Sequence, residues 1–199
     1  MHLFSGQAFR GLRVGILGGS FNPAHEGHLH ISLLALKKMR LHFVWWLVSP
    51  QNPLKPEQGM ASFAARLAGA KKVAAPFPRI IVTGLESRLG TRFTADTLQK
   101  LRLRFPHTRF IWMMGADNLL QIPRWQRWGE IFKNTDIAVF RRPPYFAGAA
   151  SGKAAQRFAH ARLDPRRAAL LGTGEKRQWV LFNNQLHSAS ATQIRSGKR

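Results

Sequence analysis

The sequence of 199 residues contains no cysteine, so disulfides, thiolate metal sites and cysteine nucleophiles are excluded. It also has no apolar run long enough to span a bilayer, because charged residues interrupt every candidate stretch. Residues 1–13 are basic but lack the continuous apolar core of a signal peptide. We expect residues 1–12 to form a loose extension, with a transit peptide as the minor alternative. These absences favour a cytoplasmic protein without a membrane partner.

Acidic residues are scarce: Asp and Glu number 9 against 31 Lys and Arg, which gives a formal net charge of +22. Such a field attracts anions and raises the rate at which they bind. Nucleic acid and small phosphorylated substrates are both candidates, and a solvated basic surface is the simplest interpretation of many of these charges. Because the basic residues are spread along the chain and no stacking-platform motif accompanies them, the sequence favours small substrates over nucleic acid.

Apolar residues make up 45% of the chain, which is enough for a single globular domain spanning residues 1–199. Short apolar runs alternate with helical patterns. They predict strands over residues 14–17, 43–48, 79–83, 110–114, 137–140 and 179–182. Helices are expected over residues 28–39, 61–75, 94–105, 118–121, 126–132, 156–162 and 192–196, with loops over residues 49–58 and 147–155. This alternation predicts an α/β fold with a doubly wound parallel sheet, whose ligands bind beyond the carboxyl ends of the strands.

The segment GGSFNPAHEGH joins the first predicted strand to the first predicted helix. Gly18 and Gly19 allow a tight turn in which the backbone approaches a phosphate closely. Backbone N–H groups of Ser20, Phe21 and Asn22, or the Asn22 amide, can point into that turn. The start of the helix adds the positive end of its dipole, so the segment predicts a nucleotide-phosphate site.

Two histidines follow at the start of the predicted helix. His25 and His28 are three residues apart, so on a helix they share a face, and both can donate N–H to phosphate oxygens. A zinc site is the weaker alternative, because no third ligand stands at a suitable local spacing. The segment contains neither the Gly-Lys-Ser/Thr of a Walker loop nor Gly-x-Gly-x-x-Gly.

The histidine pair resembles the His-x-Gly-His signature of the nucleotidyltransferase superfamily. The preceding Gly-Gly-Ser-Phe-Asn-Pro resembles the bacterial nicotinate-nucleotide adenylyltransferases, which usually carry a proline where this chain has Ala24. The resemblance implies a Rossmann-like nucleotidyltransferase fold and catalytic roles for His25 and His28. It also implies ATP contacts from the residues before them, namely Gly18, Gly19, Ser20, Phe21 and Asn22.

Later segments resemble parts of the same family that contact the acceptor. Thr94, in Arg-Phe-Thr-Ala-Asp-Thr-Leu, is implied to lie near the nicotinate ring, although a helix N-cap is the simpler role. Gly115 and Asp117, in Met-Gly-Ala-Asp-Asn-Leu-Leu, are implied to bind the substrate at a strand end, and Asp117 has the same capping alternative. Trp125 resembles the tryptophan that stacks on the nicotinate ring, whereas Trp128 is expected in the core.

Two basic residues complete the implied substrate site. Lys55 stands in a proline-rich loop that resembles the family's loop after the second strand. It reaches a phosphate in one interpretation and is an ordinary solvated lysine in the other. Arg142 belongs to Arg-Arg-Pro, which matches the family after a later strand.

The hexapeptide Ser-Ala-Thr-Gln-Ile-Arg near the end of the chain resembles the family's second nucleotide signature. Ser190 and Thr192 can cap a terminal helix whose start faces the ATP phosphates. The resemblance implies ATP contacts from both of them and from Ile194. Arg195 is implied to be catalytic, since its fixed charge suits the β- and γ-phosphates.

Together these segments imply transfer of AMP from ATP to nicotinate mononucleotide, giving deamido-NAD and pyrophosphate in NAD biosynthesis. We expect Mg²⁺ to arrive with ATP, with no protein metal ligand and no tightly bound organic cofactor. Nicotinamide mononucleotide, or another phosphorylated acceptor, is the alternative within this class of enzyme. A basic nucleic-acid-binding module is the alternative of another class and predicts salt-dependent binding of DNA or RNA. The sequence leaves the oligomeric state open, a homo-oligomer included.

Overall fold

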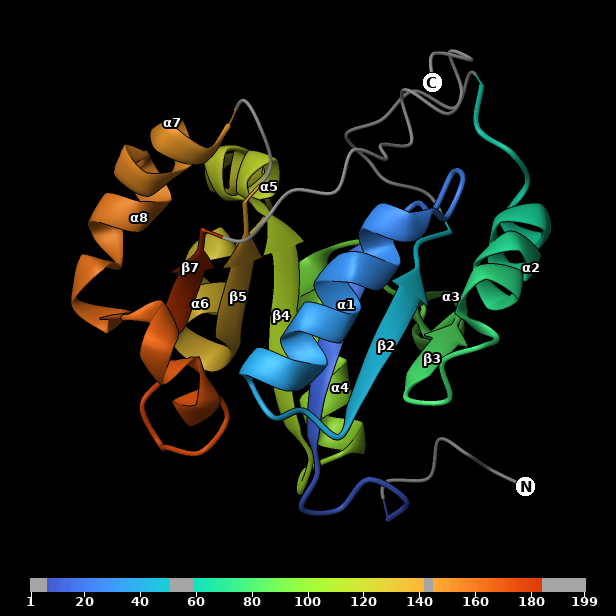
Figure 1. The fold of residues 1–199 in the computed structure, drawn as a ribbon, viewed down its shortest axis with the longest axis horizontal. Helices are drawn as coiled ribbons and strands as arrows, with labels where there is room; N and C mark the ends of the chain where they lie inside the picture. The colour runs from blue at the N-terminus through green and yellow to red at the C-terminus, as the bar shows by residue number, and fades with distance from the viewer. Residues whose placement is uncertain (1–6, 51–58, 142–144, 184–199) are drawn as a thin grey trace.

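The computed structural model describes residues 7–50, 59–141 and 145–183. Within them a seven-stranded sheet runs through the molecule in the order β3-β2-β1-β4-β5-β7-β6, and every strand pairs with its neighbours in parallel (Figure 1). The strands are β1 (Arg13–Gly19), β2 (Phe43–Val48), β3 (Ile80–Thr83), β4 (Arg109–Gly115), β5 (Asp136–Phe140), β6 (Arg162–Leu163) and β7 (Trp179–Phe182). The predicted doubly wound parallel sheet is confirmed, and each predicted strand is present.

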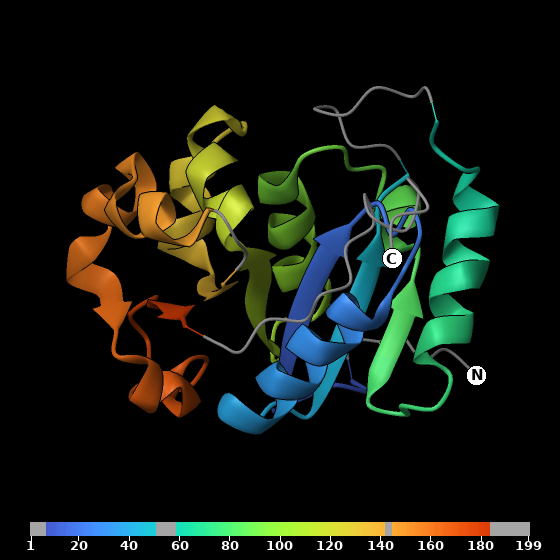
Figure 2. The same cartoon turned by 45° about the horizontal axis from the view of Figure 1, so that its top comes forward.

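Helices cover both faces of this sheet. They are α1 (Glu26–Lys38), α2 (Phe63–Ala74), α3 (Leu85–Leu89), α4 (Thr94–Arg104), α5 (Ala116–Gln121), α6 (Trp128–Asn134), α7 (Phe146–Ser151) and α8 (Lys153–Arg157). The described residues also form three 3₁₀ turns: η1 (Ile122–Arg124) between α5 and α6, η2 (Ala159–Ala161) between α8 and β6, and η3 (Pro165–Leu170) between β6 and β7. One apolar cluster lies under α3 to α8, and a second lies under α1, α2 and η3. Figure 2 shows α2 and the α5–α8 group at opposite sides of the molecule.

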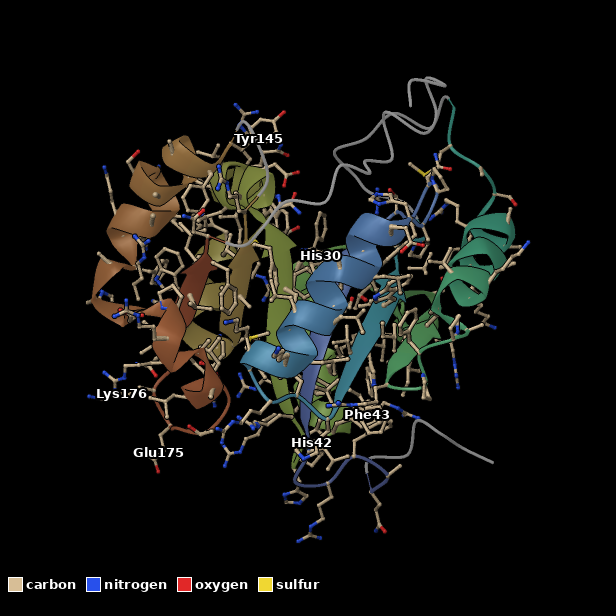
Figure 3. The ribbon with its side chains drawn as sticks, viewed as in Figure 1. His30, His42, Phe43, Tyr145, Glu175 and Lys176 are labelled. Carbon is tan, nitrogen blue, oxygen red and sulfur yellow. The ribbon has the colours of Figure 1, made fainter. Side chains whose placement is uncertain are left out.

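Strand β2 shows why a central parallel strand has a continuous apolar sequence. Neighbouring side chains point to opposite faces of a sheet, and here both faces are covered. Trp45 and Trp46 are each 0% exposed, and they belong to the two different clusters. At the amino end of β2, the His42 Nδ1 accepts the Arg13 N–H at 3.0 Å, so His42 marks the edge of the sheet opposite Tyr145 (Figure 3).

Three sequence expectations about the fold are wrong. Residues 7–12 are not a loose extension, because Phe9 is 4% exposed and its ring packs edge-on against Trp45 at 4.8 Å between centroids. The expected loop over residues 147–155 is instead largely helical in α7 and α8, and the helix expected over residues 156–162 gives way after Arg157 to η2 and β6. The short helix α3 was not predicted. No helix among the described residues is long and apolar enough to cross a membrane.

Candidate active site

The site predicted from the sequence lies where the strand order reverses. The chain passes from β1 outward to β2 and β3, then returns to place β4 on the other side of β1. In doubly wound sheets this reversal opens a crevice at the carboxyl ends of the two central strands. Leu17 of β1 stands opposite Met113 of β4, so the strand ends at Gly19 and Gly115 lie at the same edge. The loop before α1 and the start of α5 therefore flank the crevice.

The two glycines at the end of β1 have a different local role from the one expected. Both lie within the strand, and neither has a positive φ. A Cβ on Gly18 would stand 2.3 Å from Cη2 of Trp112, so close packing of β1 on this indole requires glycine there. The left-handed backbone of the loop falls on Phe21, with φ 48°, and the buried Phe21 ring stacks on Trp46 at 5.1 Å.

His25 and His28 meet at the start of α1. His25 is the N-cap, with an extended backbone, so it is not on the helix as the spacing suggested. Its Nδ1 accepts the Gly27 N–H at 3.1 Å, while the His28 Nδ1 accepts the His25 N–H at 3.2 Å. The two rings are 4.0 Å apart between centroids. They therefore form a reciprocal cap that replaces the usual Ser/Thr and Glu pair.

This cap decides which ring nitrogen carries the proton. A neutral imidazole has one donor and one acceptor nitrogen, and the hydrogen bond at one nitrogen sets the tautomer. Because both Nδ1 atoms accept backbone N–H groups, both rings carry their proton on Nε2. The pair thus presents two N–H donors at the positive end of α1, an arrangement suited to phosphate oxygens.

A short polar chain holds His28 from behind. The Ser32 hydroxyl donates to the His28 carbonyl at 2.7 Å and accepts the buried Trp46 Nε1–H at 2.8 Å. The rings of Phe21, Trp46 and His28 all contact one another, with centroids 4.7 Å apart for Phe21 and His28 and 5.8 Å apart for His28 and Trp46. The loop, the helix and strand β2 are therefore packed as one unit around the histidine.

Arg66, on α2, ties two loops of the site together. Its side chain is 4% exposed, and its guanidinium donates to the carbonyls of Ser20 at 2.6 Å, Ser49 at 2.8 Å and Pro50 at 2.7 Å. Its Nε donates to the Ala61 carbonyl at 3.0 Å. Burial lowers the pKa of Arg66 from its ordinary value. Backbone carbonyl dipoles thus take the place of a carboxylate partner around this charge.

The Asn22 amide has a bridging role that the sequence did not suggest. Its Nδ2 donates to the Gly59 carbonyl at 3.2 Å, and its Oδ1 accepts the Ala61 N–H at 3.3 Å. The loop before α1 is therefore tied to the segment that leads into α2 both by this amide and by Arg66.

On the β4 side, Gly115 is the N-cap of α5 and Asp117 lies in its first turn. The alternative role of Asp117 as a helix cap is therefore wrong. Thr94 is likewise not an N-cap: it is the first residue of α4, and Phe93 precedes it as the cap. Both polar residues stand at the first turn of a helix, where the backbone N–H groups and the positive dipole end are found.

The Thr94 and Trp125 segments are brought together by an ion pair. Asp96 Oδ1, two residues after Thr94, is bonded to the Arg127 guanidinium, two residues after Trp125. Trp125 is partly buried and packs against the cluster under α3 to α8. Trp128, expected in the core, is also partly buried there, and its ring meets Phe132 and Phe158 edge-on.

Sequence comparisons agree with this geometry. Residues 16–197 match the cytidylyltransferase-like family. A protein of Parvibaculum lavamentivorans named probable nicotinate-nucleotide adenylyltransferase is 52% identical over 185 residues, covering 93% of this chain and 92% of its own. A protein of the same name from Cereibacter sphaeroides is 48% identical, covering 94% of this chain and 97% of its own. The chain belongs to the nicotinate-nucleotide adenylyltransferases within the cytidylyltransferase-like family.

Solved structures support the fold of this nucleotidyltransferase. Plasmodium falciparum nicotinic acid mononucleotide adenylyltransferase complexed with NaAD superimposes with a TM-score of 0.66 at 16% identity, over 93% of this chain and 83% of that chain. The complex of the same protein with APC gives a TM-score of 0.65. This likeness confirms the predicted Rossmann-like fold, and the relatives at 52% and 48% identity confirm the predicted class of enzyme.

Several predicted site residues of this nucleotidyltransferase lie outside the described residues, so their roles stay predictions. They are Lys55, Arg142, Ser190, Thr192, Ile194 and Arg195, together with the helix expected over residues 192–196.

Sequence reasoning missed Arg66 and Glu86. Arg66 stands three residues after Phe63 and four before Ala70, within the apolar stripe of α2, and a charge on such a stripe is a signal of a buried polar role. Glu86 follows β3 and is 8% exposed; burial raises its pKa, although its Oε1 accepts a hydrogen bond from Thr97 at 3.2 Å. Only the fold shows that these two residues support the loops around the site.

Proposed function

We propose that this enzyme transfers AMP from ATP to nicotinate mononucleotide, producing deamido-NAD and pyrophosphate in NAD biosynthesis. The observation that carries the proposal is the reciprocal cap of His25 and His28 at the start of α1, which leaves the proton of each neutral ring on Nε2, beside the crevice between β1 and β4. The choice of nicotinate mononucleotide as the acceptor follows the name of the relatives, probable nicotinate-nucleotide adenylyltransferase.

The reaction requires no covalent enzyme intermediate. An oxygen of the acceptor's 5′-phosphate attacks the α-phosphorus of ATP, the bond to the β-phosphate breaks, and pyrophosphate leaves. Negative charge shifts onto the bridging oxygen as that bond breaks. His25 and His28 donate hydrogen bonds to the α-phosphate and to the departing group, and Arg195 holds the pyrophosphate. Positioning and charge stabilisation of this kind supply the rate enhancement.

ATP lies along the carboxyl end of β1 in this proposal. In this proposal the backbone of the loop before α1 contacts its phosphates, and residues of the second signature contact ATP as well. The contacting residues are Gly18, Gly19, Ser20, Phe21, Asn22, Ser190, Thr192 and Ile194. The bridges that Asn22 and Arg66 make to the segment before α2 support the geometry of this loop.

The acceptor lies on the β4 side. Thr94 and Trp125 contact the nicotinate ring, Gly115 and Asp117 bind the rest of the nucleotide, and the basic side chains of Lys55 and Arg142 face its phosphate. The ion pair between Asp96 and Arg127 supports this assignment, because it fixes the Thr94 and Trp125 segments beside each other.

Mg²⁺ enters with ATP. We assign ATP phosphates and water as the ligands of this ion, because Mg²⁺ usually keeps several waters and binds the phosphates of its substrate. When bound, the ion neutralises phosphate charge. The cytoplasmic location and the oligomeric state, a homo-oligomer included, stay predictions.

The test is pyrophosphate release from ATP and Mg²⁺ with nicotinate mononucleotide or nicotinamide mononucleotide as the acceptor. We expect turnover with a preference for the acid. Absence of turnover with both acceptors would refute the proposal, whereas a preference for the amide would change only the acceptor. His28→Ala is expected to lower kcat by roughly 10²–10³-fold, the usual effect of losing one donor to a developing charge. His30→Ala removes a histidine from the same helix and is the matched control.

The nucleic-acid-binding alternative is tested in the same preparation. It predicts that salt-dependent binding of DNA or RNA is the main activity and that no nucleotide acceptor is turned over. No specific contact among the described residues favours it.

A further inference from the structure

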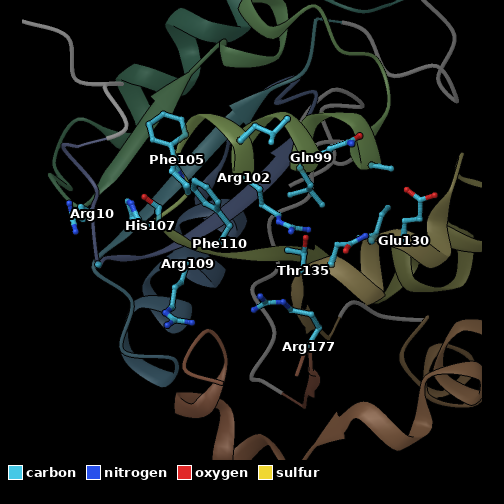
Figure 4. Close-up of a pocket in the computed structure, with 18 residues that line it drawn as sticks. Arg10, Gln99, Arg102, Phe105, His107, Arg109, Phe110, Glu130, Thr135 and Arg177 are labelled. Atoms are coloured by element: carbon cyan, nitrogen blue, oxygen red, sulfur yellow. The ribbon is translucent and has the colours of Figure 1, made fainter. Parts of the chain in front are cut away.

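A second cavity opens at the edge of the sheet opposite the active site. Its volume is about 770 Å³, and residues of α4, α6 and the amino end of β4 line it (Figure 4). Arg109 and Phe110 of its lining stand at the amino end of β4, and the lining continues along α4 to Ala95, the residue after Thr94. The volume is within the range of sites that hold nucleotide-sized molecules. Nothing in the adenylyl transfer reaction uses this edge.

The lining of this cavity is strongly basic. Arg10, Arg102, Arg109 and Arg177 all line it, and Glu130 is the only carboxylate among its lining residues. Glu130 Oε2 is 3.4 Å from the Arg127 guanidinium, so its charge is already shared with another arginine. The cavity is therefore a concave surface with an excess of positive charge. Such a surface raises the local concentration of small anions.

Thr135, whose hydroxyl is buried, is also among the residues that line the cavity. Thr135 is 4% exposed, and its Oγ1 has no hydrogen-bond partner among the described residues. Figure 4 shows this oxygen facing the end of the Arg102 side chain, with Arg177 approaching from the other side. Buried hydroxyl groups in folded proteins nearly always have a partner, so an orphaned one beside two guanidinium groups indicates a missing acceptor.

Arg177 retains donors for such an acceptor. Its Nη1 lies 3.5 Å from Asp136 Oδ2, a long contact. Asp136 is satisfied mainly by backbone N–H groups, from Gln178 at 2.7 Å to Oδ1 and from Gly172 at 3.1 Å to Oδ2. The contact with Asp136 thus holds the Arg177 guanidinium at the rim of the cavity and leaves other N–H groups of Arg177 able to donate to a ligand.

We propose that this cavity binds a small phosphate-bearing molecule, with Arg102, Arg177 and the Thr135 hydroxyl as donors to one phosphate group. A tetrahedral phosphate accepts hydrogen bonds from several directions, and guanidinium groups bind it bidentately. The three donors come from α4, the residue after α6 and the segment before β7, and a tetrahedral group can accept from such different directions more readily than a planar carboxylate can. The proposal does not rest on the proposed reaction, since Arg102, Thr135 and Arg177 have no role in it.

The test uses inorganic phosphate, pyrophosphate and a 12-nucleotide single strand of DNA as probes. Binding is followed by amide NMR shifts and by calorimetry on the full chain. We expect phosphate and pyrophosphate to shift the Thr135 and Arg102 amides. We expect Thr135→Val and Arg102→Ala to weaken this binding at least tenfold. Arg104→Ala removes the same charge from the same helix outside the cavity lining and should bind as the unmodified protein does.

Thr135→Val also distinguishes a ligand site from a merely structural role. Because the hydroxyl has no partner among the described residues, removing it should leave the denaturation midpoint unchanged or raise it in the absence of anions. Added phosphate should raise the midpoint of the unmodified protein more than that of the variant, because both proteins keep the phosphate contacts proposed at the start of α1. Equal phosphate binding by both proteins would overturn the proposal. So would binding of pyrophosphate at the active site alone, or binding of the DNA strand while both small anions leave the Thr135 amide unmoved.

Discussion

Arg66 is the residue at which stability and activity should change together. Replacing it with methionine keeps most of the buried hydrocarbon volume but removes every donor of the guanidinium. The carbonyls of Ser20, Ser49, Pro50 and Ala61 then lose a charged donor at once. Hydrogen bonds to charged groups contribute about 1.5–3 kcal/mol each, and neighbouring ones are not additive. We expect Arg66→Met to lower the free energy of unfolding by about 3–5 kcal/mol.

The same change should slow catalysis, because Arg66 fixes the Ser20 carbonyl in the loop that precedes the histidine pair. A displacement of about 1 Å in a catalytic group costs on the order of 10²-fold in rate. We expect a loss of at least tenfold in kcat/KM for ATP in the folded variant. The stability and kcat/KM of Arg66→Lys should lie between those of the unmodified protein and Arg66→Met, since an ammonium offers three donors from a single point.

The assay is urea denaturation followed by pyrophosphate release at a temperature where the variant is folded. Lys71→Met removes an exposed cation from the same helix and is the matched control. If Arg66→Met unfolds at the same urea concentration as the control and keeps its kcat/KM, the guanidinium does not hold the two loops and our argument is refuted.

Three further predictions concern neighbouring positions. Burial raises the pKa of Glu86, so its contribution to stability is present below the ordinary value of 4.5 and is lost as the pH rises through the raised pKa. In urea titrations from pH 4.5 upward, the free energy of unfolding of Glu86→Gln should depend less on pH than that of the unmodified protein. Parallel pH profiles for the two proteins would contradict this. Gly18→Ala should lower stability by about 1–3 kcal/mol through its clash with Trp112, measured by thermal unfolding, and an unchanged midpoint would contradict the packing argument. Asp96→Asn should weaken the pairing with Arg127 and raise KM for nicotinate mononucleotide more than KM for ATP; equal changes in both would contradict the assignment of this pair to the acceptor side.

The sheet could be predicted because its strands carry a strong local signal. The apolar run of β2 is buried on both faces, and the segments between strands have helical patterns. The helices over residues 146–157 carry no such signal, since they are rich in alanine and glycine. Ala149, Ala154 and Ala155 are nevertheless buried, because small side chains allow these helices to pack closely on their neighbours. Tertiary contacts, which composition does not reveal, decide this region.

The candidate site could be predicted in part for a similar reason. The histidine pair and its glycine-rich approach are contiguous in sequence, so their spacing identifies them. The mutual capping of His25 and His28 depends on the extended backbone of His25, which the spacing did not reveal. Arg66 contacts Ser20 across 46 positions, and only the assembled fold brings them together.

The reciprocal cap also determines how well ordered the His25 and His28 rings are before the substrate binds. Each neutral imidazole has two tautomers and two ring orientations, so a pair of free rings has roughly sixteen arrangements, equivalent to about 1.6 kcal/mol of entropy at room temperature. The two backbone bonds to the Nδ1 atoms of His25 and His28 select one arrangement. The entropy of ordering the two rings is therefore lost when the first turn of α1 folds. Nucleotide binding does not have to order them again.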